Sequence, residues 1–507
     1  MGDTSGRELK AGILLLVCSV LILFFHAYSY NYVVDDAYIS YRYARNLVDG
    51  HGLVFNPGER VEGYTNFLWV MITALGMQAG IAPVLLTKAL CFAFSALTLV
   101  VLYRYAGPVF GLKGPLRALP PLLAAASPAM AVWSLGGLET TFFAFLVTLA
   151  VLSHLSGVQR GRVPMASSAC ALIASLTRPE GILIAAILFV DLLWRRPGAR
   201  ALWLWLIPLA AGYIPYFVWR YSYYGFLFPN TFYAKTGGGL YHAARGLSYA
   251  KGYFISPGGW LFMLAIVPLI ACRRKWGLVL AICAAWIAYV VAVGGDGLAM
   301  HRFFVPVIPL LFLLAAGGAR EVSRRLAGSL GPRASAGLIA VISALGLLTT
   351  LYPSMSSADR DFVIEDRIRV QGNWVPIGKW LRDYARPGDS IAVTAAGALP
   401  YYSGLYTIDM LGINDVHIAH RDMPAGGGGI AGHEKHDMEY VLLKRPTYIF
   451  HYPFFTGRPV ITRDQFVTEW NPGMILLFGS EDFRRNYEPV SERFGEAVLN
   501  FFRLKAG

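Results

Sequence analysis

The chain has 507 residues, of which 56% are hydrophobic and 15% are charged, and its formal net charge is +13. Soluble domains carry about 25% charged residues, so this composition excludes a chain made only of soluble domains, and it also excludes intrinsic disorder. Five cysteines are too few for a secreted disulfide scaffold. The basic residues stand in short clusters between apolar runs. This pattern favours a polytopic membrane protein over a nucleic-acid-binding protein.

The N-terminal segment predicts a first transmembrane helix. Arg7 and Lys10 precede an apolar run over residues 11–30, which is long enough to cross a bilayer. A secretory signal has a shorter apolar core followed by a small-residue cleavage site, and no such site follows here. We therefore expect an uncleaved helix with its N-terminus in the cytoplasm.

Further apolar runs bring the total to about 11 predicted transmembrane helices. The weakest pair flanks Arg178, Pro179 and Glu180, because such residues are costly in lipid. We place these three residues at the outer membrane surface or at a helix break facing a cavity. The further runs are 84–104, 118–135, 140–156, 164–178, 180–194, 201–223, 258–272, 276–294, 302–319 and 334–353.

Basic residues in the connections test this topology, because they mark cytoplasmic loops. They gather in every second connection between the predicted helices. All of these connections are cytoplasmic if the run at 65–82 lies along the outer membrane surface and does not cross the bilayer. The outer parts are then a first loop at 31–83, a loop at 224–257, a short loop around 295–302 and a segment from 354 to 507. The basic clusters lie at 104–117, 160–162, 195–200, 273–275 and 320–333.

The C-terminal segment is more polar and mixes helical and strand patterns. VPIGKWLRDYA has helical spacing, whereas RPGDSIAVTAA, LYTIDMLG and RPTYIFHY are typical of strands. We expect a transmembrane domain over 1–353, an extracytoplasmic α/β domain over 354–507, and a flexible glycine-rich loop at 425–432. The cysteines lie in or beside predicted helices, which indicates helix packing; they are Cys18, Cys91, Cys170, Cys272 and Cys283.

The first outer loop is the densest polar segment. Asp35 and Asp36 follow the first helix, and Tyr38, Arg42 and Arg45 come next at helical spacing. A carboxylate at the membrane surface can act as a general base or ligate a metal, and a helix N-cap is the structural alternative. The polar set is completed by Asp49, His51, Arg60, Glu62 and Tyr64.

This loop resembles that of the GT-C glycosyltransferases, and it is most similar to the terminal arabinofuranosyltransferases of the mycobacterial cell wall. The resemblance rests on the acidic pair followed by AYISYRYARNL and GHGLVFNPGERVEGYTNFLW. Four shorter motifs follow in order: TRPEG (177–181), PNTFYAK (229–235), GGDGLAMHRF (294–303) and YTIDMLGIND…IAH…GHEK (406–435). One departure is size, since those enzymes have a larger outer domain.

The resemblance implies a multi-pass enzyme of the GT-C type in the bacterial inner (plasma) membrane, with no nucleic-acid partner. Such an enzyme moves a sugar, arabinofuranose in the most similar branch, from a polyprenyl-phosphate donor to an extracytoplasmic glycan or protein acceptor. The catalytic carboxylate carries over to Asp35 or Asp36. Deprotonation of the acceptor suits an inverting reaction, whereas one base does not explain retention, and both remain open.

The leaving polyprenyl phosphate develops negative charge, which a cation near the membrane surface would stabilise. Candidates at predicted outer helix ends are Arg178, Lys235, His301 and Arg302. Snorkelling side chains and an interfacial aromatic belt are the structural alternatives.

Other polar residues are expected to contact substrate, with turns and ordinary loop structure as the alternative. They are Tyr38, Arg42, Glu62, Tyr64, Asp296, Asp409, Asn414, Asp415 and His433. The C-terminal members of this set are joined by His417, Glu434 and His436, and these histidine and acidic side chains raise the possibility of a metal site. Their spacing matches no closed zinc site. A divalent cation at Asp35 and Asp36 is a separate option, and no other cofactor is expected.

Two other function classes remain as alternatives. A transporter or flippase of a lipid-linked sugar predicts functional charges deep in the helices and no large outer domain, whereas these helices hold few charges. A membrane-anchored binding or assembly protein leaves the polarity of the acidic loop unexplained. The sequence has no P-loop and no G-x-G-x-x-G after a strand, which argues against a nucleotide-driven pump.

Overall fold

The chain folds into two compact units. In the computed structural model, unit 1 contains Met1–Tyr32, Val84–Val218 and Ala243–Val363, and unit 2 contains Val33–Pro83, Trp219–His242 and Ile364–Gly507. The predicted first outer loop therefore shares a unit with the C-terminal segment. The described residues are 2–235, 239–270, 274–355, 357–423, 432–451, 454–459 and 471–506. Most of the predicted loop at 425–432, and Cys272, lie outside them.

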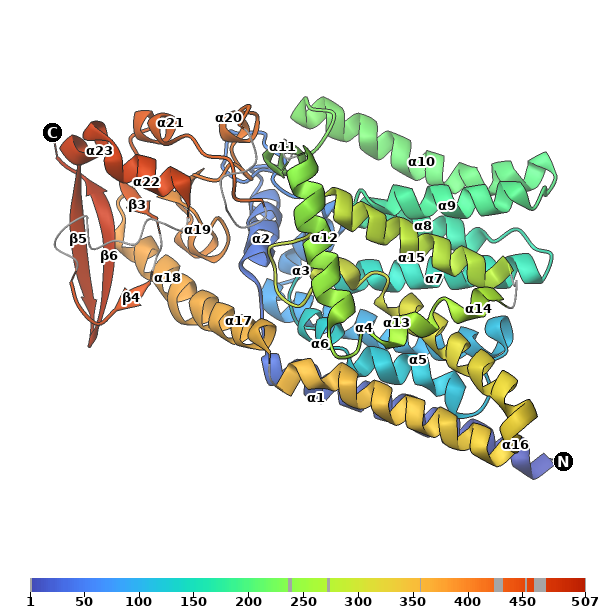
Figure 1. Cartoon of the computed structure of the whole chain (residues 1–507). Helices are drawn as coiled ribbons and strands as arrows, with labels where there is room; N and C mark the ends of the chain where they lie inside the picture. The colour runs from blue at the N-terminus through green and yellow to red at the C-terminus, as the bar shows by residue number, and fades with distance from the viewer. Residues whose placement is uncertain are drawn as a thin grey trace. The chain divides into compact units, whose positions relative to one another are not determined.

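Unit 1 is built from helices (Figure 1). Within it, α5 packs against both α1 and α16, and α8 packs against α7 and α9. The helices of unit 1, or shared with unit 2, are α1 Gly2–Tyr30, α4 Pro83–Phe110, α5 Pro115–Ala126, α6 Pro128–Trp133, α7 Thr140–Gln159, α8 Met165–Thr177, α9 Gly181–Trp194, α10 Ala199–Tyr224, α12 Gly239–Ile255, α13 Leu261–Leu264, α14 Val267–Ile270, α15 Arg274–Ala292, η1 Arg302–Phe304, α16 Ile308–Met355 and α17 Ala358–Arg367.

Among the described residues, 6 helices are long and apolar enough to cross a membrane. They are Lys10–Tyr30, Pro83–Phe110, Thr140–Gln159, Ala199–Tyr224, Lys275–Ala292 and Arg333–Met355. The shorter α8 and α9 are also apolar, and so is α3 (Phe67–Gln78) of unit 2. The chain is a polytopic helical membrane protein, and the count of about 11 crossings remains a prediction.

Several predicted runs are not single helices. The run at 118–135 forms α5 and α6, because Pro128 has no amide hydrogen with which to continue the first helix. The run at 258–272 forms the short helices α13 and α14. The run at 334–353 and most of the run at 302–319 fall within α16, whose helical backbone is broken at Gly331 (φ 80, ψ 167).

Unit 2 combines short helices with a 6-stranded sheet in the order β2-β1-β3-β6-β4, with β5 also paired to β6. β1 is parallel to β2 and β3, whereas β6 is antiparallel to β3, β4 and β5. The bounds are β1 Ser390–Val393, β2 Tyr406–Asp409, β3 Tyr448–Phe450, β4 Phe455–Thr456, β5 Tyr487–Phe494 and β6 Ala497–Leu504. The helices are α2 Asp35–Val48, α3, α11 Asn230–Lys235, η2 Ile368–Trp374, α18 Val375–Tyr384, α19 Ala398–Ser403, α20 Val416–Ala419, α21 Met438–Leu443, α22 Pro472–Gly479 and α23 Glu481–Asn486.

The helix expected in VPIGKWLRDYA is present as α18, and the three expected strands are present as β1, β2 and β3. Strand β1, which lies between β2 and β3, is buried on both faces, because Ile391, Ala392 and Val393 are all fully buried. Ala392 pairs with Ile408 on one side and with Ile449 on the other. This register fixes the loops after β1 and β2, which carry the candidate site residues.

Candidate active site

The two adjacent aspartates at the start of α2 have different surroundings. The Asp35 carboxylate accepts hydrogen bonds from the backbone N–H groups of Gly397 (3.0 Å) and Ala398 (2.7 Å), at the start of α19. The side chain of Asp36 makes no hydrogen bond or ion pair with any residue that the structure describes. Both lie in the first turn of α2, where the helix dipole favours negative charge. Asp36 is therefore the carboxylate left available to a substrate.

The contact between α2 and α19 leaves no room for a side chain at Gly397. A Cβ there would lie 2.1 Å from the backbone oxygen of Asp35 and 2.5 Å from its Cγ. Burial raises the pKa of Asp35 to about 8. The N–H bond from Ala398 opposes this shift, whereas the carboxylates of Asp36 and Asp366 add to it.

Arg42, predicted to bind substrate, is committed to the protein instead. Its guanidinium has five N–H donors, and the structure gives each an acceptor within unit 2. Because no donor is left for a ligand, we assign Arg42 a structural role in joining α2 to the segment before β2. The acceptors are the carbonyls of Phe55, Pro400 and Leu405 (each 2.7 Å), Asn56 Oδ1 (3.0 Å) and Thr407 Oγ1 (3.3 Å).

Tyr38 also lies inside the protein, in a tyrosine cluster formed by α2 and α19. Its ring centroid is 5.2 Å from that of Tyr41 and 5.7 Å from those of Tyr401 and Tyr402. Arg45 donates to the carbonyl of Tyr401 and lies 3.5 Å from the centroid of its ring. Tyr38, Arg42 and Arg45 therefore lie on one face of α2, as their spacing predicts. This face packs mainly against α19.

Glu62 and Tyr64 are paired with the last residues of α10. Glu62 Oε2 lies 2.7 Å from Arg220 Nη2, and Glu62 Oε1 accepts from Arg220 Nε at 3.0 Å. The Tyr64 hydroxyl lies 3.0 Å from that of Tyr224. These pairs fix the loop that carries Gly63.

The turn after β2 is held by its own polar side chains. Asp409 accepts from the backbone N–H groups of Leu411 (3.1 Å) and Asn414 (2.9 Å) and from Asn414 Nδ2 (3.0 Å). Asp415 caps α20 by accepting from the N–H of Ile418 (3.0 Å), and it also accepts from the Tyr440 hydroxyl (3.1 Å). Asp409, Asn414 and Asp415 thus shape the turn itself.

Two residues that the sequence did not single out join this turn to the rest of unit 2. Asn230 Nδ2 donates to the carbonyls of Gly412 and Ile413, both at 2.9 Å. At Gly63, a Cβ would lie 2.0 Å from Asn414 Oδ1, so the loop and the turn touch. The motif PNTFYAK contains Asn230, but its long-range partners are invisible in the sequence.

Lys235 ends α11 with an exposed side chain. Its aliphatic part packs on Gly432, where a Cβ would lie 2.9 Å from Lys235 Cε. His433 follows and is half-buried, and the Oε2 of Glu434 accepts from the N–H of Gly432 at 2.8 Å. The structure therefore brings Lys235 beside the GHEK motif.

The two arginines predicted to bind phosphate are paired with carboxylates inside unit 1. Arg178 contacts Glu139 at 2.7 Å and Glu180 at 2.9 Å, between its Nη atoms and their Oε1 atoms. Arg302 Nε lies 2.6 Å from Asp296 Oδ2. Both guanidinium groups and Asp296 thus have partners inside unit 1, and their predicted contacts with donor or substrate remain a prediction.

His301 lines a cavity of about 160 Å³ in unit 1, together with Tyr253, Phe262 and Thr350. His301 has a left-handed backbone (φ 50), and its Nδ1 lies 3.6 Å from Asp359 Oδ2. Burial lowers the pKa of His301, and Asp359 opposes the shift. The role of His301 stays a prediction.

Within the described part of the chain, no three histidine, cysteine or acidic side chains converge as metal ligands would. Asp35 already accepts two N–H bonds, so Asp36 is the carboxylate of the pair that a cation would meet first. The divalent cation remains a prediction.

Comparisons with known proteins place this geometry in context. Residues 363–502 match a domain of unknown function, DUF8728. The chain is 27% identical over 400 residues to a terminal β-(1→2)-arabinofuranosyltransferase of Mycobacterium tuberculosis, covering 73% of this chain and 61% of that protein. It is 25% identical over 345 residues to the Corynebacterium glutamicum enzyme of the same name, covering 57% and 48%. It therefore spans less than two thirds of the length of either relative.

Solved structures show the same fold. ArnT from Cupriavidus metallidurans, bound to undecaprenyl phosphate, matches with a TM-score of 0.62 and 14% identity, over 97% of this chain and 98% of that one. The oligosaccharyltransferase AglB from Archaeoglobus fulgidus, in complex with an inhibitory peptide and a dolichol-phosphate, matches with a TM-score of 0.54 and 11% identity, over 81% and 65%. The chain therefore has the fold of these two proteins, and the predicted resemblance to the arabinofuranosyltransferases is confirmed by the sequence matches.

Proposed function

We propose that this chain is a membrane glycosyltransferase that moves a sugar from a polyprenyl-phosphate donor to an acceptor hydroxyl outside the cytoplasm. The relatives' names support the reaction class and favour arabinofuranose as the sugar. The undecaprenyl phosphate in ArnT supports the class of donor. The observation that carries the proposal is Asp36, an unpaired carboxylate among the described residues, at the start of a helix whose neighbouring aspartate is fixed.

Asp36 is the proposed general base. It accepts the proton of the acceptor hydroxyl while the acceptor oxygen bonds to the anomeric carbon of the sugar. The bond from that carbon to the phosphate oxygen breaks, and polyprenyl phosphate leaves with the electron pair. General-base catalysis of this kind contributes roughly 10²- to 10⁴-fold.

Asp35 is the proposed positioning residue. Its two N–H bonds to the start of α19 hold the first turn of α2, and with it the backbone that carries Asp36. Asp35 therefore affects the reaction by holding Asp36 in position.

Lys235 is the proposed ligand of the donor phosphate. Of the four predicted cations, Arg178 and Arg302 are neutralised by carboxylates and His301 faces Asp359. Lys235 is exposed, and no ion pair joins it to another described residue. Its charge stabilises the leaving group as the sugar–phosphate bond breaks.

The test is transfer by the full-length chain in membrane vesicles, given radiolabelled polyprenyl-phosphate arabinofuranose and a synthetic arabinose oligosaccharide. We expect Asp36→Asn to lower kcat/KM by about 10²-fold or more, because Asn does not take up a proton. The matched control is Asp49→Asn, an exposed aspartate at the other end of α2. We expect its rate to stay close to wild type. Wild-type transfer by Asp36→Asn would refute the assignment.

A further inference from the structure

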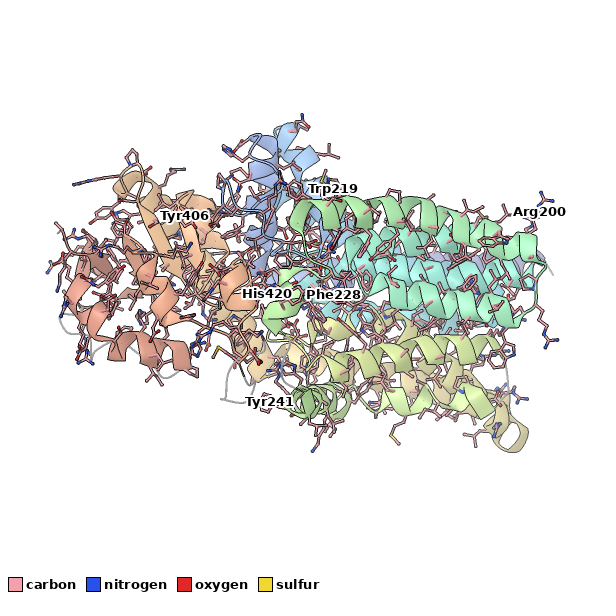
Figure 2. The ribbon with its side chains drawn as sticks, turned by 90° about the horizontal axis from the view of Figure 1, so that it is seen from above. Arg200, Trp219, Phe228, Tyr241, Tyr406 and His420 are labelled. Atoms are coloured by element: carbon pink, nitrogen blue, oxygen red, sulfur yellow. The ribbon has the colours of Figure 1, made fainter. Side chains whose placement is uncertain are left out.

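A short segment of unit 2 presents three large apolar side chains to the outside. Leu227, Phe228 and Phe232 are 52%, 43% and 45% exposed, and the ring centroids of the two phenylalanines lie 4.4 Å apart. We call these three residues the 227–232 patch; Figure 2 labels Phe228 within it. Single exposed apolar residues are ordinary, whereas a cluster points to an interaction surface.

Hydrogen bonds on both sides hold the patch outward. Arg220 Nη1 donates to the carbonyl of Leu227 at 3.0 Å. Asn230 Nδ2 donates to the carbonyls of Gly412 and Ile413, each at 2.9 Å. These bonds fix the backbone of the segment in the conformation that leaves the three apolar side chains exposed.

The position of the patch in the chain identifies the partner that covers it. Helix α10 is apolar enough to cross a membrane, and only 6% of its most apolar stretch is buried in protein, as expected of a helix whose side chains face lipid. The helix ends at Tyr224, Gly225 turns the chain with φ 81, and the patch begins at the second residue after that glycine. Residues this close to the end of a span lie at the membrane–water interface, where aromatic side chains are enriched.

The residues around the patch match the layers of that interface. His420 packs its ring against Tyr233 and Phe226, with centroids 4.1 Å and 4.7 Å apart. Burial and the neighbouring Lys435 lower the pKa of His420. Lys235 is the exposed cation at the end of α11. Apolar side chains with a lysine beside them suit acyl chains below anionic phosphates.

We propose that the 227–232 patch inserts into the outer interfacial layer of the phospholipid bilayer. The bonds of Asn230 then tie the turn at 412–415 to the membrane surface and set its height above the lipid. This inference requires α10 to cross the bilayer, and it stands whether or not the chain transfers a sugar.

The test measures depth in the membrane with the full-length protein in vesicles of phosphatidylcholine and phosphatidylglycerol. A bimane label is placed at Phe228→Cys or Phe232→Cys after the five native cysteines are replaced. The matched control is Leu443→Cys, which is 81% exposed in the same unit. With brominated acyl chains, we expect quenching of about twofold or more at 228 and 232, and none at 443.

Two outcomes would overturn the proposal. The first is a label at 228 and 232 that aqueous iodide quenches as readily as the label at 443, in variants that melt like the parent. The second is a short distance between nitroxides at 228 on two chains, which would mean that a second copy covers the patch. The melting temperature also shows whether either cysteine variant is folded.

Discussion

At the scale of single residues, the adjacent aspartates Asp35 and Asp36 differ in their hydrogen-bond partners. Asp35 is fixed by two backbone N–H groups, whereas Asp36 has no partner among the described residues. The sequence indicated a carboxylate in this position without distinguishing the two. The distinction depends on Gly397 and Ala398, which lie more than 360 residues further along the chain.

The raised pKa of Asp35 makes stability depend on pH. Burial holds this pKa near 8 in the folded protein, above its ordinary value of 3.8. The folded state therefore binds the proton more tightly than the unfolded state, and this stabilisation is fully present below about pH 4. It is lost as the pH rises from about 4 to 8, by at most about 1.4 kcal/mol per pH unit.

We predict that the melting temperature of the wild type falls relative to that of Asp35→Asn as the pH is raised from 5 to 8, because Asn does not titrate. Thermal unfolding of the two proteins in the same detergent measures the difference. Parallel curves would show that Asp35 has an ordinary pKa.

In the transfer assay, Asp35→Asn should lose less activity than Asp36→Asn, because its amide oxygen still accepts one N–H bond.

The partners of three arginines could not be predicted from residue type and spacing. Arg42, Arg178 and Arg302 have the charge and position of substrate ligands, and each is instead satisfied inside the protein. The partners of Arg42 include carbonyls 358 and 363 residues away, and Glu139 lies 39 residues from Arg178. Such pairings are set by the tertiary fold, so a single sequence does not reveal them.

At the scale of elements, the contact between α2 and α19 is the critical packing in the candidate site. Gly397→Ala would place a Cβ 2.1 Å from the backbone oxygen of Asp35, so one helix has to move. Overpacking of this kind costs about 1–3 kcal/mol. We expect a lower melting temperature and a transfer rate reduced by about tenfold or more.

The control for Gly397→Ala is Gly479→Ala, at the end of α22 in the same unit, where a Cβ meets no atom within 4 Å. It should keep both the melting temperature and the transfer rate. Equal behaviour of the two variants would show that the close approach at Gly397 is unimportant.

Secondary structure was largely predictable where the pattern is local. The apolar runs, the helix α18 and the strands β1, β2 and β3 follow from periodicity and turn residues. The helix break at Pro128 was not predicted, although proline signals one, whereas the break at Gly331 lies within the predicted connection at 320–333. The sharing of unit 2 by the first outer loop and the C-terminal segment arises from contacts distant in sequence, which a single sequence does not reveal.

At the scale of the whole molecule, the predicted orientation in the membrane is open to a direct test. Basic clusters such as that at Arg160 should face the cytoplasm, and the C-terminal segment should lie outside. In a cysteine-free background, Leu443→Cys should react with an impermeant maleimide in intact cells, whereas Arg160→Cys should react only after permeabilisation. The reverse pattern would invert the topology.

The most direct measurement of the central claim uses the purified full-length chain in vesicles with radiolabelled polyprenyl-phosphate arabinofuranose and an oligosaccharide acceptor. Our account predicts a new glycosidic bond in the acceptor, polyprenyl phosphate released in equal amount, and neither product from Asp36→Asn. Movement of the intact lipid-linked sugar across the bilayer without either product would contradict a glycosyltransferase and support a flippase.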